Sequence, residues 1–143
     1  MQRVLLLSIQ SKYAEKIFNG EKTVELRRVR LRLEMGDHVF VYVPSPKKRL
    51  IGGFEVERIV ERVPGELWEE VKHHAGMTRK EFQDYYYEKS LGFGIFFRGI
   101  WCFRAPVYLD DLRQVWPEFR PPQGYWYLTP AEVDLIQNIG QVI

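Results

Sequence analysis

The segment Gly20–Arg28, G-E-K-T-V-E-L-R-R, contains a short strand pattern in which charged and apolar residues alternate. Its glycine can end a preceding helix, since glycine readily adopts the left-handed backbone conformation. Because side chains alternate along a strand, the polar residues should share one face and the apolar ones the other. So much charge is unusual for a buried strand, so we expect a dry face against a core and a wet face lining a cleft. The alternating residues are Thr23, Glu25 and Arg27 against Val24 and Leu26.

The composition is that of one globular domain. The chain has 143 residues, of which 45% are hydrophobic and 28% charged, values typical of a folded protein and of a single domain over residues 1–143. The net charge of +2 excludes a polycationic nucleic-acid coat. A local basic pocket remains compatible with it.

Metal-ligating residues are few. The single cysteine, Cys102, has no partner for a disulfide or a thiolate site, and only three histidines are present. We therefore expect no metal and no cofactor. The apolar run Val4–Leu7 is too short for a signal peptide or a membrane span, which favours a cytoplasmic protein without a membrane partner.

Strand patterns outnumber helical ones, and strands often follow strands directly. This order favours an α+β fold with a small, open, mostly antiparallel β-barrel and inserted helices over a doubly wound sheet. Gly52 and Gly53 mark a bend near the start of one long strand pattern. Strands are predicted over residues 3–9, 23–28, 38–43, 50–63 and 91–103, and helices over 11–18, 64–75, after the capping box at Thr78, near 110–112 and after the capping box at Thr129.

The charged strand is the leading candidate for a site. A lysine can shift its pKa when it is buried, and an arginine fork can hold a phosphate or a base edge with two hydrogen bonds. Glu25 could accept a hydrogen bond from an exocyclic amine or act as a general base. The alternative for Lys22, Glu25 and Arg27 is a solvated strand face with surface ion pairs.

A second unusual segment, Arg120–Leu128, joins two prolines to a run of aromatic residues. The prolines favour an extended path, and the aromatic side chains belong either to the core or to a stacking surface for a base. Gln123 carries a donor and an acceptor on one amide, which suits a base edge. The basic residues at 28–32 and 47–49 form either a phosphate-facing rim or screened surface charge.

These segments resemble the ASCH domains of the PUA-like superfamily, in particular a subgroup described as predicted transcriptional regulators. The resemblance covers nearly the whole chain. It is carried by the ordered motifs Leu7–Ile9, Tyr13–Phe18, Gly20–Thr23, Glu25–Arg27, Pro44–Pro46, Ile51–Phe54, Glu66–Trp68, Gly94–Ile95, Arg120–Gln123 and Tyr127–Leu128.

The resemblance implies a PUA-like barrel whose cleft near the first helix binds RNA, a nucleotide or a modified nucleobase. Double-stranded DNA is the less favoured partner, because the second helix of the helix-turn-helix candidate at residues 66–89 does not have a basic recognition face. The ligand-binding residues that we expect are Ser8, Lys22, Glu25, Arg27, Arg28, Ser45, Gln123 and Tyr125.

Some relatives are amidohydrolases that act on acetylated cytidine with a lysine, a threonine and a glutamate. Lys22 matches the lysine, but the other two positions hold Glu25 and Ala75 here. Other relatives are ribonucleases, and no nuclease residue set maps onto this chain. The sequence therefore favours a binding module. Two alternatives remain: a small hydrolase that uses Lys22 and Glu25, and a protein-interaction domain.

Overall fold

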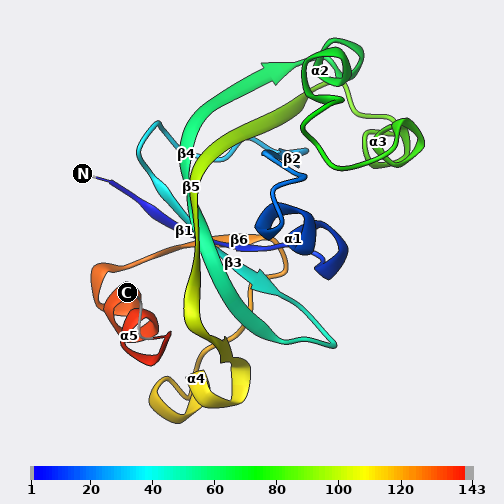
Figure 1. The fold of residues 1–143 in the computed structure, drawn as a ribbon. Coiled ribbons are helices and arrows are strands. Elements are labelled where there is room, and N and C mark those ends of the chain that lie inside the picture. Colours follow the sequence, from blue (N-terminus) through cyan, green and yellow to red (C-terminus); the bar gives the residue numbers. More distant parts are fainter. Residues whose placement is uncertain (1, 141–143) are drawn as a thin grey trace.

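The computed structural model describes residues 2–140, which form one curled, six-stranded sheet with helices at its two ends (Figure 1). The strand order is β2-β5-β4-β3-β1-β6, so β2 and β6 are the two edges. The elements are β1 (Val4–Ser8), α1 (Ser11–Phe18), β2 (Val24–Arg27), β3 (His38–Val43), β4 (Arg49–Arg62), α2 (Pro64–Val71), α3 (Arg79–Tyr85), β5 (Gly92–Tyr108), α4 (Leu109–Val115), β6 (Tyr125–Leu128) and α5 (Pro130–Gly140).

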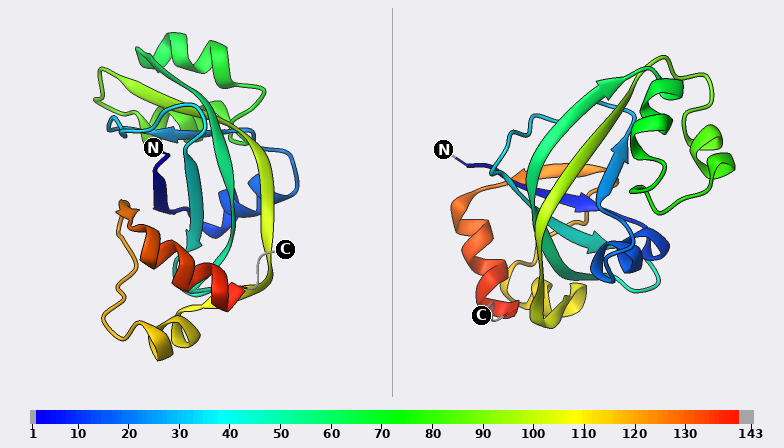
Figure 2. Two further views of the ribbon diagram at one scale, coloured as in Figure 1. Left: turned by 90° about the vertical axis from the view of Figure 1, so that its left-hand side faces the viewer. Right: turned by 45° about the horizontal axis from the view of Figure 1, so that its top comes forward.

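The pairing is antiparallel except between β1 and β3, which run in parallel from Val4 opposite His38. The long strands β4 and β5 bend together through the whole molecule, with α2 and α3 at one end and α4 and α5 at the other (Figures 1 and 2). The predicted α+β class with an open, mostly antiparallel barrel is confirmed. Strand β5 runs beyond the predicted end at Phe103, through Pro106 to Tyr108.

Gly53 explains how β4 bends closely against its neighbours. A Cβ at this residue would lie 2.2 Å from the carbonyl oxygen of Val39, a distance that no side chain tolerates. The register between β4 and β5 shifts on both sides of the glycine pair, between Leu50 and Gly52 and again between Gly53 and Glu55. The predicted bend at Gly52 and Gly53 is therefore present as a pair of bulges.

Two of the helix starts follow the predicted capping boxes. The Thr78 hydroxyl accepts a hydrogen bond from the backbone of Glu81, whose carboxylate accepts one from the backbone of Thr78. Thr129 and Glu132 make the same reciprocal pair at the start of α5. Gly20 follows α1 with φ of 88°, so the glycine predicted to end this helix has the left-handed backbone that the turn needs.

Residues 125–128, for which the sequence predicts only an extended aromatic segment, form the edge strand β6. This strand pairs with β1, so its side chains alternate between the two faces of the sheet. Trp126 and Leu128 pack with the buried cluster of Leu6, Phe40 and Phe119. Tyr125 and Tyr127 point to the other face and are 39% and 37% exposed.

Candidate functional site

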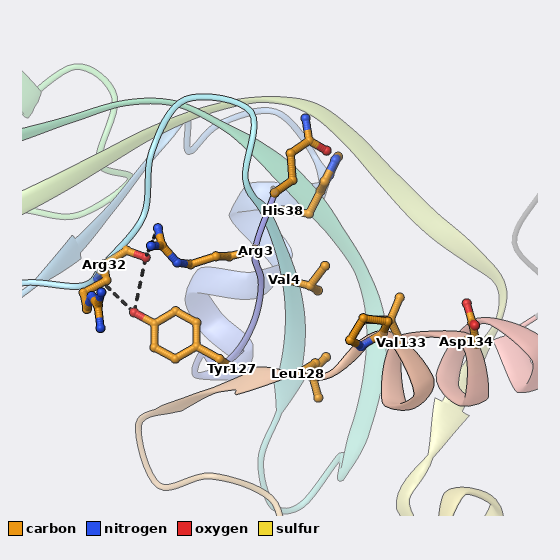
Figure 3. A pocket seen from close by; sticks show the side chains of 10 residues that line it. Arg3, Val4, Arg32, His38, Tyr127, Leu128, Val133 and Asp134 are labelled. Atoms are coloured by element: carbon orange, nitrogen blue, oxygen red, sulfur yellow. Dashed lines mark hydrogen bonds between the residues drawn. The ribbon is translucent and has the colours of Figure 1, made fainter.

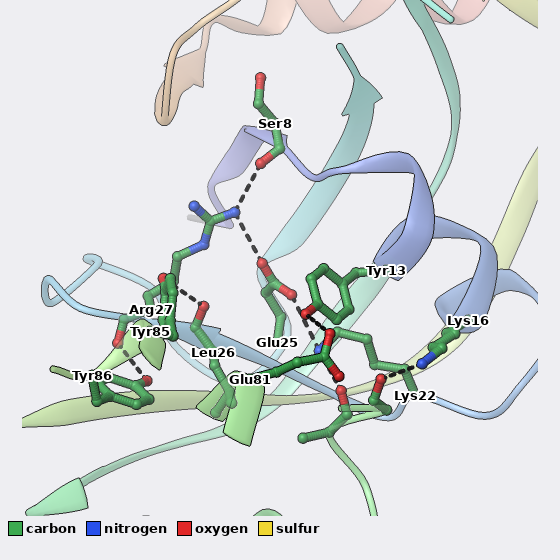
Figure 4. A network of polar contacts seen from close by, with 12 residues as sticks. Ser8, Tyr13, Lys16, Lys22, Glu25, Leu26, Arg27, Glu81, Tyr85 and Tyr86 are labelled. Carbon is green, nitrogen blue, oxygen red and sulfur yellow. Dashed lines mark hydrogen bonds and ion pairs between the residues drawn. The ribbon is translucent and has the colours of Figure 1, made fainter. Parts of the chain in front are cut away.

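A pocket of about 670 Å³ lies between α1, β2 and α3, beside the end of β1. We call it the α1–α3 pocket. Several separate parts of the chain contribute to it, and the charged strand forms its floor (Figure 4). The lining residues are Ser8, Ile9, Gln10, Tyr13, Lys22, Glu25, Leu26, Arg27, Arg28, Pro44, Met77, Glu81, Asp84, Tyr85 and Gln123.

Lys22 is almost completely buried, with 1% of its surface exposed. Its Nζ donates a hydrogen bond of 2.7 Å to the carbonyl oxygen of Ala75 and lies 5.3 Å from the centre of the Tyr13 ring. Burial lowers the pKa of Lys22 below its ordinary value, although the nearby carboxylate of Glu25 opposes this effect. The ammonium group is thus held by a carbonyl, a ring and a carboxylate.

Glu25 links Lys22 to Arg27 in a short chain of charges. One carboxylate oxygen of Glu25 lies 3.6 Å from Nζ of Lys22, and the other lies 3.0 Å from Nη2 of Arg27. The same Nη2 donates to the carbonyl oxygen of Ser8 at 3.0 Å, which ties β2 to β1. We call Lys22, Glu25 and Arg27 the ion-pair chain.

All three charges line the α1–α3 pocket, as expected of a strand face that lines a cleft, but Lys22 and Glu25 are buried at its floor and not solvated as predicted. Lys22 and Glu25 are 1% and 7% exposed, and the loop that follows α2 supplies the carbonyl oxygen of Ala75 to Lys22. Opposite charges compensate one another within the chain of contacts, so the strand can bury them. Arg27 is the most exposed of the three, and its buried Nε has no protein partner among the described residues.

Tyr13 and Glu81 form the opposite wall, between α1 and α3. The Tyr13 hydroxyl donates to Oε2 of Glu81 at 2.8 Å. Burial and this hydrogen bond raise the pKa of Tyr13 to about 12. Contacts with Lys12, Thr78 and Tyr13 lower the pKa of Glu81 to about 2, so Glu81 carries its charge throughout the physiological range.

The rim of the pocket is more exposed and carries groups suited to a ligand. The guanidinium of Arg28 lies 4.6 Å from the centre of the Tyr85 ring, whose hydroxyl donates to the carbonyl oxygen of Leu26. Gln123 is exposed and is held beside the pocket by its neighbours. Ser8 donates its hydroxyl to the carbonyl oxygen of Pro122 at 2.6 Å.

Six of the eight predicted ligand-binding residues line this pocket: Ser8, Lys22, Glu25, Arg27, Arg28 and Gln123. Ser45 is exposed in the turn between β3 and β4, outside the lining. Tyr125 also lies outside it, on β6.

The sequence reasoning missed Tyr13, Glu81 and Tyr85. Helical spacing places Tyr13 on the apolar face of α1, and the sequence motif marks Glu81 only as half of a capping box. Glu81 performs both roles, because Oε1 accepts from the backbone of Thr78 while Oε2 accepts from Tyr13. Only the capping role of Glu81 can be predicted from neighbouring residues, because its contact with Tyr13 spans 68 residues.

A model of the ASCH domain family matches residues 7–97. This chain belongs to the ASCH domain family. An ASCH domain-containing ribonuclease of Zymomonas mobilis is 26% identical over 94% of this chain and 90% of its own length. The crystal structure of ASCH from that organism has a TM-score of 0.89, with 95% of this chain and 94% of that chain covered.

More distant relatives share the fold. The human THYN1 protein, solved in complex with DNA that contains 5-methylcytosine, has a TM-score of 0.59 at 14% identity over 99% of both chains. At this identity the likeness shows the PUA-like fold alone. The transcriptional-regulator subgroup stays a prediction.

The difference from the acetylcytidine amidohydrolases at Glu25 and Ala75 stays a prediction of the sequence. In the structure, Glu25 belongs to the ion-pair chain, and Ala75 is buried and offers its carbonyl oxygen to Lys22. Glu81 brings a second carboxylate to the pocket from α3 instead.

The described part of this ASCH chain contains neither a metal-binding cluster nor a membrane-spanning helix. Within residues 2–140, no group of three or more histidine, cysteine, aspartate or glutamate side chains could hold a metal ion. No helix among those residues is long and apolar enough to cross a membrane.

Proposed function

We propose that this ASCH domain binds single-stranded RNA by accepting one nucleotide into the α1–α3 pocket. The observation that carries the proposal is the buried ion-pair chain of Lys22, Glu25 and Arg27, which forms a polar floor beneath an open rim. A rigid set of charges that already neutralise one another presents hydrogen-bonding groups in fixed positions. Such preorganisation favours a ligand with its own pattern of donors and acceptors.

The charges of the pocket favour a base over a bare phosphate on its floor. Its lining balances three cations against three carboxylates, so it has no excess charge that would attract an anion. A nucleobase, in contrast, can donate to a carboxylate and accept from an arginine or an amide at the same time. The charged lining residues are Lys22, Arg27, Arg28, Glu25, Glu81 and Asp84.

The rim can hold the remaining parts of a nucleotide. Arg28 is exposed and can contact a phosphate while its plane lies over the Tyr85 ring. Gln123 can read a base edge through its amide. In this arrangement the base enters the pocket and the phosphate stays at the mouth, where water lowers the cost of the charge.

Fluorescence anisotropy with a labelled, mixed-sequence RNA of about eight nucleotides tests the proposal. Gln123→Ala and Arg28→Ala change exposed residues and should leave the fold intact. We expect each to weaken binding by about fivefold or more, the loss of one hydrogen bond to a charged or polar group. Gln114→Ala and Arg104→Ala are matched exposed controls outside the pocket. Equal affinity for all four variants refutes the pocket as the binding site.

A second candidate is RNA cleavage at the same pocket. The Zymomonas mobilis relative, similar over nearly the full length of both chains, is a ribonuclease by name. In this chain, Glu25 is the candidate base that takes the proton of a ribose 2′-hydroxyl. Lys22 is the candidate cation that stabilises the developing charge on the phosphate. The 2′-oxygen then attacks the phosphorus, the bond to the 5′-oxygen of the next nucleotide breaks, and Lys22, whose pKa is lowered by burial, is the candidate that gives this leaving oxygen a proton.

An end-labelled RNA incubated with the protein and resolved on a denaturing gel decides between binding and cleavage. If Glu25 is the base, Glu25→Gln abolishes cleavage, and the Gln123→Ala variant retains it at saturating protein. Cleavage by Glu25→Gln at the wild-type rate refutes this assignment of the base. Circular dichroism at the assay temperature confirms that the variant is folded, because its loss of charge also affects stability.

A further inference from the structure

A second pocket, of about 580 Å³, lies at the far end of β6 (Figure 3). We call it the β6 pocket. Strands β1 and β6 form its floor, and residues from α5 and from the segment before β3 form its walls. The lining residues are Gln2, Arg3, Val4, Arg32, His38, Tyr127, Leu128, Pro130, Val133 and Asp134. None of them takes part in the α1–α3 pocket.

Both pockets lie along the opening between the two edges of the curled sheet. The α1–α3 pocket is lined by β2 and by Gln123, which precedes β6. The β6 pocket is lined by Arg32, from the segment that follows β2, and by Tyr127 of β6. We call the strip between β6 and residues 28–33 the seam. The backbone N–H of Arg32 donates to the Tyr127 hydroxyl at 2.9 Å, so the segment after β2 is attached to β6 there.

Tyr125 occupies the seam between the two pockets. Alternate residues of a strand share a face, so Tyr125 and Tyr127 lie on the same side of β6, and Gln123 lies in the bend that precedes this strand. The rings of Tyr125 and Tyr127 are 6.0 Å apart, and both are more than a third exposed. Within β6, Tyr125 and Tyr127 are separated by roughly 7 Å along the strand, at about 3.4 Å per residue. One nucleotide in the α1–α3 pocket, one on each tyrosine ring and one at the β6 pocket would make a bound strand of about four nucleotides.

We propose that the seam is the path of a single-stranded RNA, from the α1–α3 pocket across Tyr125 to the β6 pocket. The inference rests on the proposed function and adds the length and the path of the bound strand. Each tyrosine offers a ring face on which a base can stack. Arg32 is exposed, and its side chain forms no ion pair among the described residues, so it can hold a phosphate at the β6 end.

The charge along the seam favours a polyanion. The segment 28–32 carries three arginines in five residues, and the only one in an ion pair among the described contacts is Arg30, with Glu61 on the surface. Arg3 of the β6 pocket forms an ion pair with Asp37, with 3.8 Å between Nη1 and Oδ2. Bases that stack on Tyr125 must be splayed apart from one another, which a duplex does not allow. The predicted occupant is therefore single-stranded.

A length series measures the path. Anisotropy titrations compare single-stranded RNAs of about one to eight nucleotides, and a duplex of the longest one. For the wild type, we expect affinity to rise up to about four nucleotides and then level off. We expect the duplex to bind more weakly than its single strands.

Variants at Tyr125 test whether the gain in affinity with RNA length comes from stacking on its ring. Tyr125→Ala should weaken the binding of the longest RNA by roughly 5- to 150-fold, the range of one base stacked on an aromatic ring. It should leave the binding of a mononucleotide unchanged. Tyr125→Phe keeps the ring and should bind as the wild type does. Tyr87→Ala is the matched control, since Tyr87 is 73% exposed and lies outside both pockets.

The outcomes separate the seam from the proposed function. If affinity is independent of length while Gln123→Ala still weakens binding, the path is refuted and the pocket stands. An effect of Tyr125→Ala on a mononucleotide, or tighter binding of the duplex, also overturns the path. If no RNA of any length binds, the proposed function falls and the path falls with it.

Discussion

Replacement of Glu25 by glutamine tests whether the ion-pair chain holds the buried lysine. The substitution keeps the shape of the side chain and removes the one negative charge between Lys22 and Arg27. Removal of one partner from a buried pair typically costs about 3–5 kcal/mol, because the remaining charge is left without compensation. We expect the lower end, about 3 kcal/mol, since Lys22 keeps the carbonyl oxygen of Ala75 and Arg27 keeps that of Ser8.

The measurement is urea denaturation together with thermal unfolding. The entropy of unfolding is about 2.1 cal/mol/K per residue, or about 0.3 kcal/mol/K for a chain of this length, so about 3 kcal/mol corresponds to a Tm about 10 °C lower. Glu61→Gln is the matched control. It removes a carboxylate that pairs with Arg30 on the surface, where both side chains are largely exposed, and should cost less than about 1 kcal/mol.

A double-mutant cycle identifies the cause of the loss. If the cost of Glu25→Gln comes from an uncompensated Lys22, adding Lys22→Met removes that charge and should recover about 1–3 kcal/mol relative to the sum of the single effects. Additivity of the two substitutions within about 0.5 kcal/mol would refute the reasoning. The two groups would then contribute to stability independently, despite the 3.6 Å between them.

Three further predictions concern stability. Because the pKa of Lys22 is lowered in the folded state, the unfolded chain binds more protons between that value and about 10.4. The free energy of unfolding should therefore rise with pH in the range just below about 10.4 in urea titrations, and Lys22→Met should flatten that rise. Gly53→Ala should prevent folding or lower the free energy of unfolding by more than about 3 kcal/mol, since its Cβ would lie 2.2 Å from the carbonyl oxygen of Val39. Gly65→Ala is the control: a Cβ there has nothing within 4 Å, so in the same assay it should be neutral or stabilising by up to about 1 kcal/mol. Thr129→Ala should lower the free energy of unfolding by about 1 kcal/mol, because a capping hydroxyl is lost, and Thr129→Ser should restore most of it.

The sequence predicted those features of the fold that depend on neighbouring residues. The capping boxes at Thr78 and Thr129 and the helix end at Gly20 each involve residues within four positions of one another, so their physical cause is visible in the chain. The bend at Gly52 and Gly53 was predicted for the same reason, because two adjacent glycines inside a strand pattern indicate a bulge or a close approach of another backbone.

The features that were missed depend on contacts between distant segments. The charged strand alone gave no sign that Ala75, 53 residues away, would cover Lys22 with a carbonyl oxygen. Without that cover the charge of the strand indicated a wet face. The edge strand β6 was missed for the same reason. Its aromatic residues are equally compatible with a core segment, and only the pairing with β1 separates Trp126, which packs against the core, from the exposed Tyr125.

The position of Arg27 connects the stability of the barrel to the ligand binding that we propose. Its guanidinium is the link between the ion-pair chain on β2 and the carbonyl oxygen of Ser8 on β1. Ser8 in turn donates its hydroxyl to Pro122 and its backbone N–H to the carbonyl oxygen of Gly124. Any ligand that draws Arg27 into the pocket must therefore compete with the contact that joins the edge strand β2 to β1. A ligand that instead bonds the unpartnered Nε of Arg27 keeps this contact and satisfies a buried donor, so the geometry favours an acceptor placed on that side of the guanidinium.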